Sequence, residues 1–289
     1  MKKVLIFFLT VLVYQAGFIF PQEAKNFTRV MTYNIRYAGD VKSAGVNAWE
    51  YRKDPVAKTI RFNKPDIVGV QEALKIQLDD FKILLPGYIQ VGVARDDGKE
   101  AGEYSALLIN KNKFKVLDNS TFWLSATPDK PSMGWDAACM RIVTWAKLKD
   151  VNTKKIIYAF NTHFDHMGTE ARKNSAILLK KKIKEIAVNN RFVLTGDFNC
   201  KIDSEPYKIL TDKEMLPQLF DSEFLSENGN YGMDVSFNNF TDELEAGNKI
   251  DFIFVSSKLK VWQHAVLGEK MNGRYPSDHM PVVADIYLP

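Results

Sequence analysis

The sequence contains few cysteines and lacks the signature motifs of several common hydrolases. Its 289 residues include two cysteines, Cys139 and Cys200, which we expect to be free and buried, so a disulfide-stapled scaffold is excluded. The chain has no Gly-x-Ser-x-Gly elbow, Walker loop, Cys/His zinc spacing or His-Glu-x-x-His motif. These absences argue against serine hydrolases, P-loop nucleotide hydrolases and zinc proteases.

Neither positive nor negative residues are in large excess. The formal net charge is +4, and Lys2 and Lys3 at the N-terminus supply two of those positive charges. A bulk charge this small is no argument for a nucleic-acid partner, although a local basic patch would be enough to bind one. The lysine cluster at 180–184 is more typical of the solvated face of an amphipathic helix than of such a patch.

The longest apolar run lies at the N-terminus. Residues 4–20 are almost unbroken apolar sequence after the basic start Met1-Lys2-Lys3. This pattern is typical of a secretory signal peptide, so we expect residues 1–24 to be removed and residues 25–289 to form one exported domain, periplasmic or extracellular. An uncleaved membrane anchor is the alternative, because the run is only just shorter than a spanning helix.

From about residue 27 onward, short apolar runs alternate with amphipathic stretches, which predicts an α/β fold. The expected strands are 27–35, 67–72, 103–110, 114–117, 142–148, 155–162, 191–196, 250–255 and 281–287. The expected helices are 51–63, a turn or more around 78–85, 170–188, and a short one from 205 that Ser204 would cap. We expect 103–110 to pair with 114–117, and 142–148 to pair with 155–162.

Polar side chains stand at or beside the ends of these apolar runs. They are Asn34, Glu72, His163, Asp197 and the pair Asp278-His279. Strand ends in α/β folds are the places where a rigid scaffold presents reactive groups. Since a core strand gains nothing from a terminal carboxylate, the recurrence of such endings indicates a shared site.

Each of these segments is ambiguous when it is taken alone. Gly196-Asp197-Phe198-Asn199 puts a carboxylate and an amide on one side of an extended chain, but a simple Asx turn explains it equally well. Asp278-His279 suits proton transfer, or is a surface loop. Glu72 is a natural ligand for a hard cation such as Mg²⁺, or forms an edge salt bridge. Asp251 lies in an apolar run and needs a buried partner, for which a histidine nitrogen would serve.

Taken in order, the motifs resemble the endonuclease/exonuclease/phosphatase superfamily, in its exported bacterial, deadenylase-like branch. They are Tyr33-Asn34, Gln71-Glu72, Thr162-His163, Gly196-Asp197-Phe198-Asn199, Ile250-Asp251 and Ser277-Asp278-His279. The resemblance covers residues 28–289 and implies two packed mixed β-sheets flanked by helices, a four-layer α/β sandwich. It also implies a Mg²⁺- or Mn²⁺-dependent phosphoric ester hydrolase that works by in-line attack of water.

The resemblance further implies roles for the matching residues. Glu72 would bind the metal, with Asn34 close to it and Asp278 in support. Asp197 would orient or deprotonate the attacking water, and Asn199 would hold that water or a phosphate oxygen.

The two histidines would act on the phosphate group. His279 would contact the scissile phosphate, with Asp251 holding its ring, and His163 would donate to a phosphate oxygen or assist the leaving group. Which of Asp197 and His279 is the base stays open.

The sequence says less about the substrate. Arg36, Arg141 and Arg172 are candidates for binding phosphate, although an ordinary ion pair explains Arg141 and Arg172 equally well. Trp135 is a candidate for stacking on a flat group, as are Trp49, Trp123 and Tyr37, with loop packing as the alternative.

Three hypotheses about function follow. An exported nuclease or nucleotide-type phosphodiesterase comes first. The binding partner would then be a phosphate-ester substrate, with nucleic acid among the candidates. A sugar or inositol phosphatase, or a sphingomyelinase-type phospholipase, comes second. A non-catalytic binding protein on the same scaffold is the remotest. Nothing implies a stable protein partner, and we expect a monomer.

Overall fold

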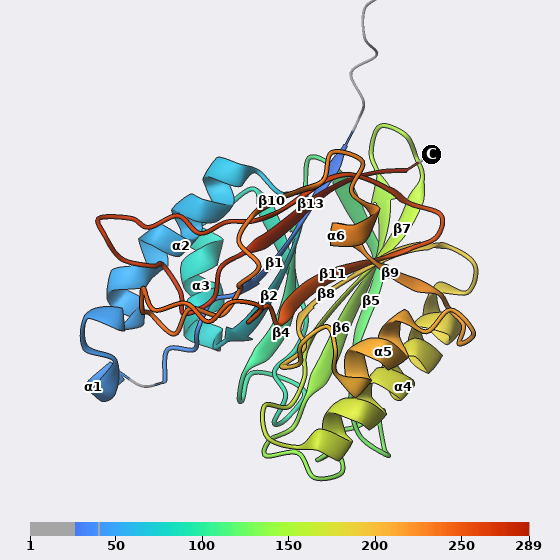
Figure 1. Cartoon of the computed structure of the whole chain (residues 1–289), viewed down its shortest axis with the longest axis horizontal. Coiled ribbons are helices and arrows are strands. Elements are labelled where there is room, and N and C mark those ends of the chain that lie inside the picture. The colour runs from blue at the N-terminus through green and yellow to red at the C-terminus, as the bar shows by residue number, and fades with distance from the viewer. Residues whose placement is uncertain (1–26, 40, 289) are drawn as a thin grey trace, which may run out of the picture.

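Two mixed β-sheets pack face to face, and helices cover the outer face of each, in the computed structural model, which describes residues 27–39 and 41–288 (Figure 1). This arrangement confirms the expected four-layer α/β sandwich. The predicted signal peptide, residues 1–24, lies outside the described residues and stays a prediction. Within the described ranges, no helix has the length and apolar character needed to span a membrane.

The strands divide into a seven-stranded and a six-stranded sheet. The first has the order β10 (Asn230–Gly232), β12 (Lys260–Val266), β13 (Val282–Tyr287), β1 (Thr28–Asn34), β2 (Ile67–Ala73), β4 (Tyr104–Asn110) and β3 (Tyr88–Val91). The second has the order β5 (Phe114–Trp123), β6 (Ile142–Asp150), β7 (Ile156–His163), β8 (Arg191–Asp197), β11 (Asp251–Ser256) and β9 (Leu219–Asp221).

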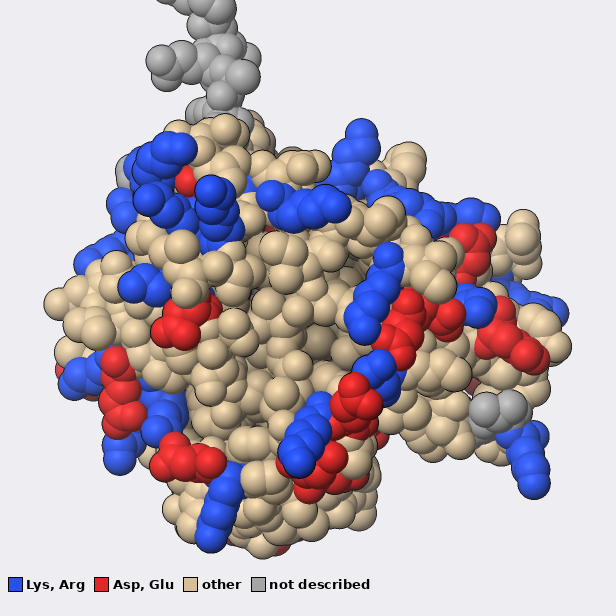
Figure 2. Space-filling view, turned by 180° about the vertical axis from the view of Figure 1, so that it is seen from behind, with Lys and Arg blue, Asp and Glu red and all other residues tan. Residues whose placement is uncertain are grey.

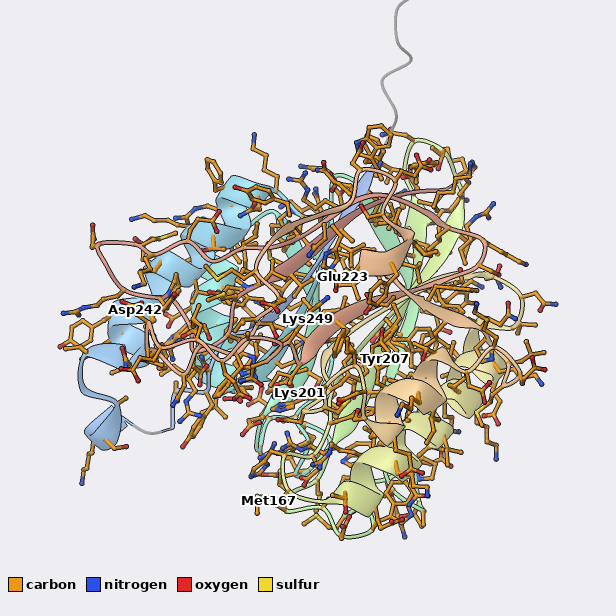
Figure 3. All side chains as sticks on the ribbon, in the orientation of Figure 1. Met167, Lys201, Tyr207, Glu223, Asp242 and Lys249 are labelled. Carbon is orange, nitrogen blue, oxygen red and sulfur yellow. The ribbon has the colours of Figure 1, made fainter. Side chains whose placement is uncertain are left out.

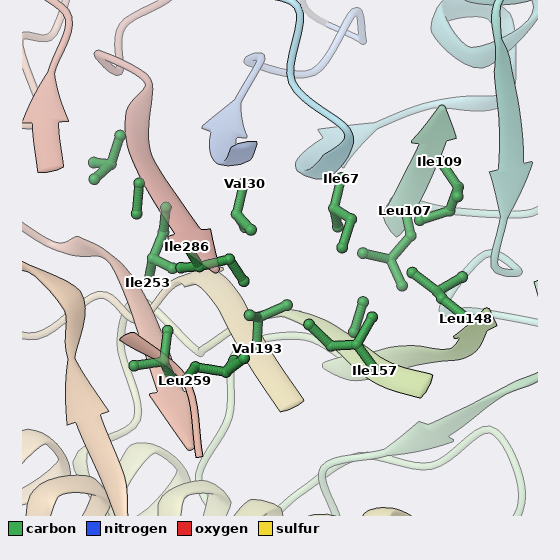
Figure 4. Packing of buried hydrophobic residues seen from close by; sticks show 14 of the residues in the cluster. Val30, Ile67, Leu107, Ile109, Leu148, Ile157, Val193, Ile253, Leu259 and Ile286 are labelled. Carbon is green, nitrogen blue, oxygen red and sulfur yellow. The ribbon is translucent and has the colours of Figure 1, made fainter. Parts of the chain in front are cut away.

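The central strands are apolar on both faces because they lie between two layers. Side chains such as Val30, Ile67 and Leu107 from the first sheet meet Val193 and Ile253 from the second, as Figure 4 shows. Strands covered on both faces have near-continuous apolar sequence rather than strict alternation. This is why the runs around β2 and β8 are easy to recognise in the sequence.

Helices complete the two outer layers. On the first sheet lie α2 (Trp49–Asn63) and α3 (Lys75–Leu84), and on the second lie α4 (Thr169–Ala187) and α5 (Glu205–Thr211) (Figure 1). The short helices are α1 (Val41–Ala44), η1 (Gly45–Asn47) and α6 (Ser222–Leu225). In α4 the apolar side predicted from the sequence is confirmed, since Leu179 and Ile183 pack against Phe192 and Leu194.

One lysine of the 180–184 cluster is not on a solvated face, which corrects the prediction. Lys180 is fully buried, and its ammonium group donates to the carbonyl oxygens of Ile209, Leu210 and Asp212 at 3.2, 3.1 and 2.8 Å. Burial lowers the pKa of Lys180 to about 8. The ammonium group thus caps the C-terminal end of α5, where the last carbonyls of a helix lack intrahelical partners.

Two local predictions need correction. The predicted pair 103–110 and 114–117 is wrong, because β4 pairs with β2 and β3 whereas β5 pairs with β6 in the other sheet. β2 and β3 already occupy both edges of β4, so no edge is left for β5, which joins the other sheet. Ser204 does precede α5, but its hydroxyl donates to the carbonyl of Lys201 instead of capping the helix. The pairing of β6 with β7 is confirmed.

The topology brings the ends of several strands to one edge of the sandwich. β1 runs parallel to β2, and β7 runs parallel to β8, so their carboxyl ends share that edge. In the second sheet Asp197 lies opposite His163 on one side and opposite Asp251 on the other. Residues far apart in the sequence therefore become direct neighbours.

Candidate active site

A pocket of about 600 Å³ opens at this edge, between the two sheets. Of the residues predicted from the sequence, those that line it are Arg36, Glu72, Arg141, His163, Asp197, Asn199, Asp278 and His279. The buried side chains of Asn34 and Asp251 lie directly behind this lining and bond to it. In Figure 3, Asp242 and Met167 mark two loops that contribute to the wall, through Phe240 and His166.

Asn34 joins the two sheets at the floor of the pocket. Its side-chain amide nitrogen donates to Glu72 Oε1 at 3.0 Å and to Asp197 Oδ2 at 2.9 Å. Its side-chain amide oxygen, Oδ1, accepts from the backbone N–H of Arg36 at 3.0 Å. One buried amide therefore sets the spacing between a carboxylate of β2 and a carboxylate of β8.

The donor set around Glu72 fits a hard divalent cation. Glu72 and Asp278 both project into the pocket, and the Arg36 guanidinium group lies 3.9 Å from the first carboxylate and 3.8 Å from the second. Burial raises the pKa of Asp278, and the nearby Glu72 carboxylate adds to the rise. Mg²⁺ and Mn²⁺ prefer oxygen ligands, carboxylates above all. Glu72 and Asp278 would therefore hold the ion.

His279 is held as an imidazolium. Its Nδ1 lies 2.8 Å from Asp251 Oδ2, which also accepts from the Ser236 hydroxyl at 2.7 Å, and its Nε2 lies 3.7 Å from Asp197. Burial opposes the charge, but the carboxylates of Asp251 and Asp197 hold the pKa of His279 well above its ordinary value. These three groups are all buried, and their nitrogen and oxygen atoms lie within 4.8 Å of one another.

His163 is held as a neutral imidazole. The amide nitrogen of Asn199 donates to the Phe164 carbonyl at 3.0 Å, which fixes the amide orientation, and lies 2.9 Å from His163 Nε2. Nε2 therefore accepts, and the ring proton sits on Nδ1. Burial and the Arg141 cation hold the pKa of His163 well below its ordinary value.

Asp197 lies between the two histidines. Its Oδ1 accepts the backbone N–H of Asn199 at 3.0 Å, and its Oδ2 lies 3.4 Å from His163 Nε2. Burial, with the Asp251 carboxylate adding to it, raises the pKa of Asp197 to about 7. A carboxyl group that exchanges a proton near neutral pH is suited to general-base work.

Three residues of the pocket have strained backbones. Arg36, Glu72 and Asn199 adopt left-handed conformations, with φ of 55°, 61° and 46°. Such conformations cost about 1–3 kcal/mol each in a non-glycine residue and persist only where the surroundings hold them.

The strain at Glu72 coincides with a break in the pairing of β2 with β4. Val70 and Ala106 are the last pair before the register shifts, and the side chain of Asn161 donates to both of their carbonyls at 2.9 Å. The oxygen of the same amide accepts from Gln71 at 2.6 Å and from Thr195 at 3.0 Å. Asn161, which the sequence analysis missed, satisfies the irregular backbone that presents Glu72.

Asp165 joins the loop before β6, which carries Arg141, to the loop after β7, which carries His166. It accepts backbone N–H groups of Ala138, Met167 and Gly168, and it lies 3.3 Å from Arg141 Nε. Burial works in the opposite direction, but these N–H groups and Arg141 hold the pKa of Asp165 well below its usual range. Arg141 also contacts His166 Nδ1 at 3.0 Å. These bonds hold the two loops together where Arg141 lines the pocket.

Two of the predicted substrate-binding residues lie elsewhere. Arg172 donates to the Asp165 carbonyl at 2.8 Å and Trp135 is 42% exposed, and neither lines the pocket. Trp49 begins α2 and Trp123 ends β5, and both are buried, so neither is in a loop and core packing accounts for both.

The pocket also contains residues that the sequence analysis missed. They include Arg95, Glu103, Phe237 and Phe240, in addition to the predicted Tyr37. Arg95 and Glu103 form an ion pair at 2.7 Å, and with Arg141 and His163 they also line a small adjoining cavity of about 10 Å³. No local motif surrounds these residues, so only the fold brings them to the site.

Comparison with known proteins shows what the chain is similar to. The profile of the Endonuclease/Exonuclease/phosphatase family matches residues 31–279. A crystal structure of an endonuclease/exonuclease/phosphatase from Bacteroides vulgatus is 44% identical, with a TM-score of 0.86, covering 92% of this chain and 100% of that chain. A mannosyl-6-phosphatase from Bacteroides thetaiotaomicron is 38% identical, with a TM-score of 0.85, covering 90% of this chain and 99% of that chain.

A curated relative is an uncharacterized protein of Acanthamoeba polyphaga mimivirus. The two are 32% identical over 187 residues, which is 59% of this chain and 66% of that protein, just under two thirds of its length. The family profile spans most of the chain, and the neighbouring structures share the whole fold. On these grounds the chain belongs to the endonuclease/exonuclease/phosphatase family, whose members hydrolyse phosphate esters.

Proposed function

We propose that the protein is a Mg²⁺- or Mn²⁺-dependent phosphatase that removes the phosphate group from a sugar or a similar small polyol. The observation that carries this proposal is that the Arg95–Glu103 pair and Arg141 line the same pocket as the acidic and histidine groups. Such side chains bond hydroxyl groups and phosphate oxygens, and about 600 Å³ suits a small molecule. The 38% identical mannosyl-6-phosphatase supports this substrate class.

The protein groups divide the work of hydrolysis. Asp197 accepts the proton of the attacking water, because the carboxylates of Asp251 and Asp197 raise the pKa of His279 and so favour its protonated form, which is no base. The His279 imidazolium stabilises the negative charge that develops on the phosphate oxygens. A divalent cation bound by Glu72 and Asp278 would offset the remaining phosphate charge. The bond from water oxygen to phosphorus forms as the phosphorus–sugar oxygen bond breaks, and the sugar oxygen takes a proton from solvent.

A nuclease or nucleotide-type phosphodiesterase is the second candidate. The rings of Tyr37, Phe237 and Phe240 line the pocket and would stack on a base. We place this candidate second because the three predicted tryptophans do not line the pocket. On the face shown in Figure 2, basic side chains gather along the upper edge, whereas basic and acidic side chains alternate lower down around a centre that carries no charged group. The N-terminal apolar segment supports export under either proposal.

A hydrolysis panel tests this proposal. It contains mannose 6-phosphate, glucose 6-phosphate, an inositol phosphate, bis-p-nitrophenyl phosphate, single-stranded DNA and RNA, and sphingomyelin, each with Mg²⁺, Mn²⁺ or EDTA. We expect metal-dependent release of phosphate from the sugar esters. Asp197→Asn should abolish the activity, whereas Asp118→Asn, at an exposed position in β5, should retain it. Cleavage of nucleic acid alone would favour the second candidate, and inactivity on every ester would refute both.

A further inference from the structure

Arg52, on the outer helix α2, has a buried guanidinium group that binds backbone carbonyls. It is 3% exposed, and its Nε donates to the carbonyl of Asn47 at 2.5 Å. Nη1 donates to the carbonyls of Ile35 at 2.7 Å and Pro276 at 3.2 Å, and Nη2 donates to the carbonyl of Arg36 at 3.1 Å. All four hydrogen bonds come from one rigid, planar group. This group therefore fixes the distances between the backbone segments that it binds.

The four carbonyls belong to the segments that carry the metal-binding and phosphate-binding side chains. Ile35 and Arg36 directly follow Asn34, and Pro276 directly precedes the Ser277-Asp278-His279 segment. Asn47 ends η1 and lines the pocket itself. These segments lack strand partners at the bonded positions, so their carbonyls depend on a side-chain donor.

Two further contacts place Arg52 at the centre of this wall of the pocket. Its guanidinium carbon lies 5.5 Å from the ring centroid of Phe240, which lines the pocket, and 5.5 Å from that of Trp49. The strained Arg36 is held from a second side, since Gln77 also donates to its carbonyl at 2.9 Å. The Ser277 hydroxyl joins the same two segments by donating to the Asn34 carbonyl at 2.7 Å.

Arg52 does not reach the reacting groups. It is absent from the lining of the 600 Å³ pocket and instead borders a separate cavity of about 270 Å³, together with Tyr51 and Arg274. A substrate bound at Asp197 and His279 would therefore not touch it. Any effect of Arg52 on hydrolysis must pass through the backbone segments that it holds.

We propose that Arg52 is a positioning residue that holds Asn34, Arg36 and Asp278 at the spacing that metal binding and hydrolysis require. This inference rests on the proposed function of the same site. Its physical basis is that five N–H donors in a rigid fork cannot be replaced by one ammonium group, which has a different shape and fewer donors. Arg52→Lys should therefore keep the positive charge but no longer hold the backbone segments of Asn34, Arg36 and Asp278 at their present spacing.

The test compares Arg52→Lys and Arg52→Gln with Arg61→Gln, an exposed arginine on the same helix. We expect Arg52→Lys to lower kcat about 100-fold on whichever phosphate ester the unmodified enzyme hydrolyses, with KM changed much less, because the substrate does not touch Arg52. Calorimetric titration with Mn²⁺ alone should show a Kd raised about 10-fold. Arg52→Gln should lower kcat and weaken Mn²⁺ binding further. Arg61→Gln should match the unmodified enzyme in kcat, KM and the Kd for Mn²⁺.

The outcomes separate this inference from the proposed function. A folded Arg52→Lys variant, judged by near-UV circular dichroism, with unchanged kcat and unchanged Mn²⁺ affinity would overturn the inference. If Arg52→Gln does not fold, Arg52→Lys decides. If neither variant folds, Arg52 serves stability alone and the inference is wrong. If the unmodified protein hydrolyses no phosphate ester, the proposed function fails, and the Mn²⁺ titration still tests the positioning of the site.

Discussion

Replacing Asn161 by leucine should destabilise the protein at the place where the two sheets meet behind the active site. The change keeps the approximate size of the side chain but removes its donors and its acceptor. The carbonyls of Val70 and Ala106 then lose a buried partner, at a cost of about 1–3 kcal/mol each. Gln71 and Thr195 each keep another hydrogen bond, so the loss of their bonds to Asn161 adds little to the cost. We expect the free energy of unfolding to fall by about 3–5 kcal/mol in total.

Urea unfolding followed by tryptophan fluorescence measures this loss. With an m-value of about 3 kcal/mol per M, the midpoint should fall by about 1–2 M. The matched control is Asn119→Leu, at an exposed position in β5 of the same sheet, which should stay within about 0.5 kcal/mol of the unmodified protein. A midpoint for Asn161→Leu that equals the control would refute the reasoning. Since Asn161 supports the irregular backbone beside Glu72, the variant should also bind Mn²⁺ more weakly.

Three other changes test separate parts of the structure. Lys180→Met removes the donor to three carbonyls and should lower the free energy of unfolding by about 2–4 kcal/mol, whereas Lys181→Met, at an exposed position, should not. The pKa of Asp165 is held below its ordinary value, so its stabilising contribution is present above about pH 4 and is lost as the pH falls further. Acid unfolding of Asp165→Asn should accordingly show a weaker pH dependence below pH ~4 than the unmodified protein, and an equal slope would contradict the assignment. Asp251→Asn removes the charge that stabilises the imidazolium of His279 and should lower kcat at least about 100-fold, measured by hydrolysis.

Most site residues were predictable from the sequence because each ends an apolar strand. Glu72, His163 and Asp197 follow directly on runs whose burial is visible from composition alone. A short polar group after such a run is a local pattern, and parallel neighbouring strands bring several of these groups to one edge. The order of the motifs along the chain then indicated the family, and the fold followed from the family.

Residues whose partners are backbone atoms were not predictable in this way. Arg52 and Asn161 bind carbonyls from several segments far away in the sequence, and any segment of any composition has carbonyls. Lys180 stands among exposed lysines in the sequence, and only the position of α5 shows that it is buried. The same limit applies to Arg95 and Glu103, which have no motif and reach the pocket through tertiary packing.

The sequence by itself therefore determined the family, the α/β class and the chemical groups at the strand ends, because apolar periodicity and short motifs are local properties. Only the tertiary structure decided the opposite directions in which the pKa values of the two histidines shift, the place of Arg172 outside the pocket and the presence of Arg95 and Glu103 within it. The reason is physical. Charge states, hydrogen-bond partners and the shape of a pocket depend on distances between segments that the chain brings together only when both sheets have packed.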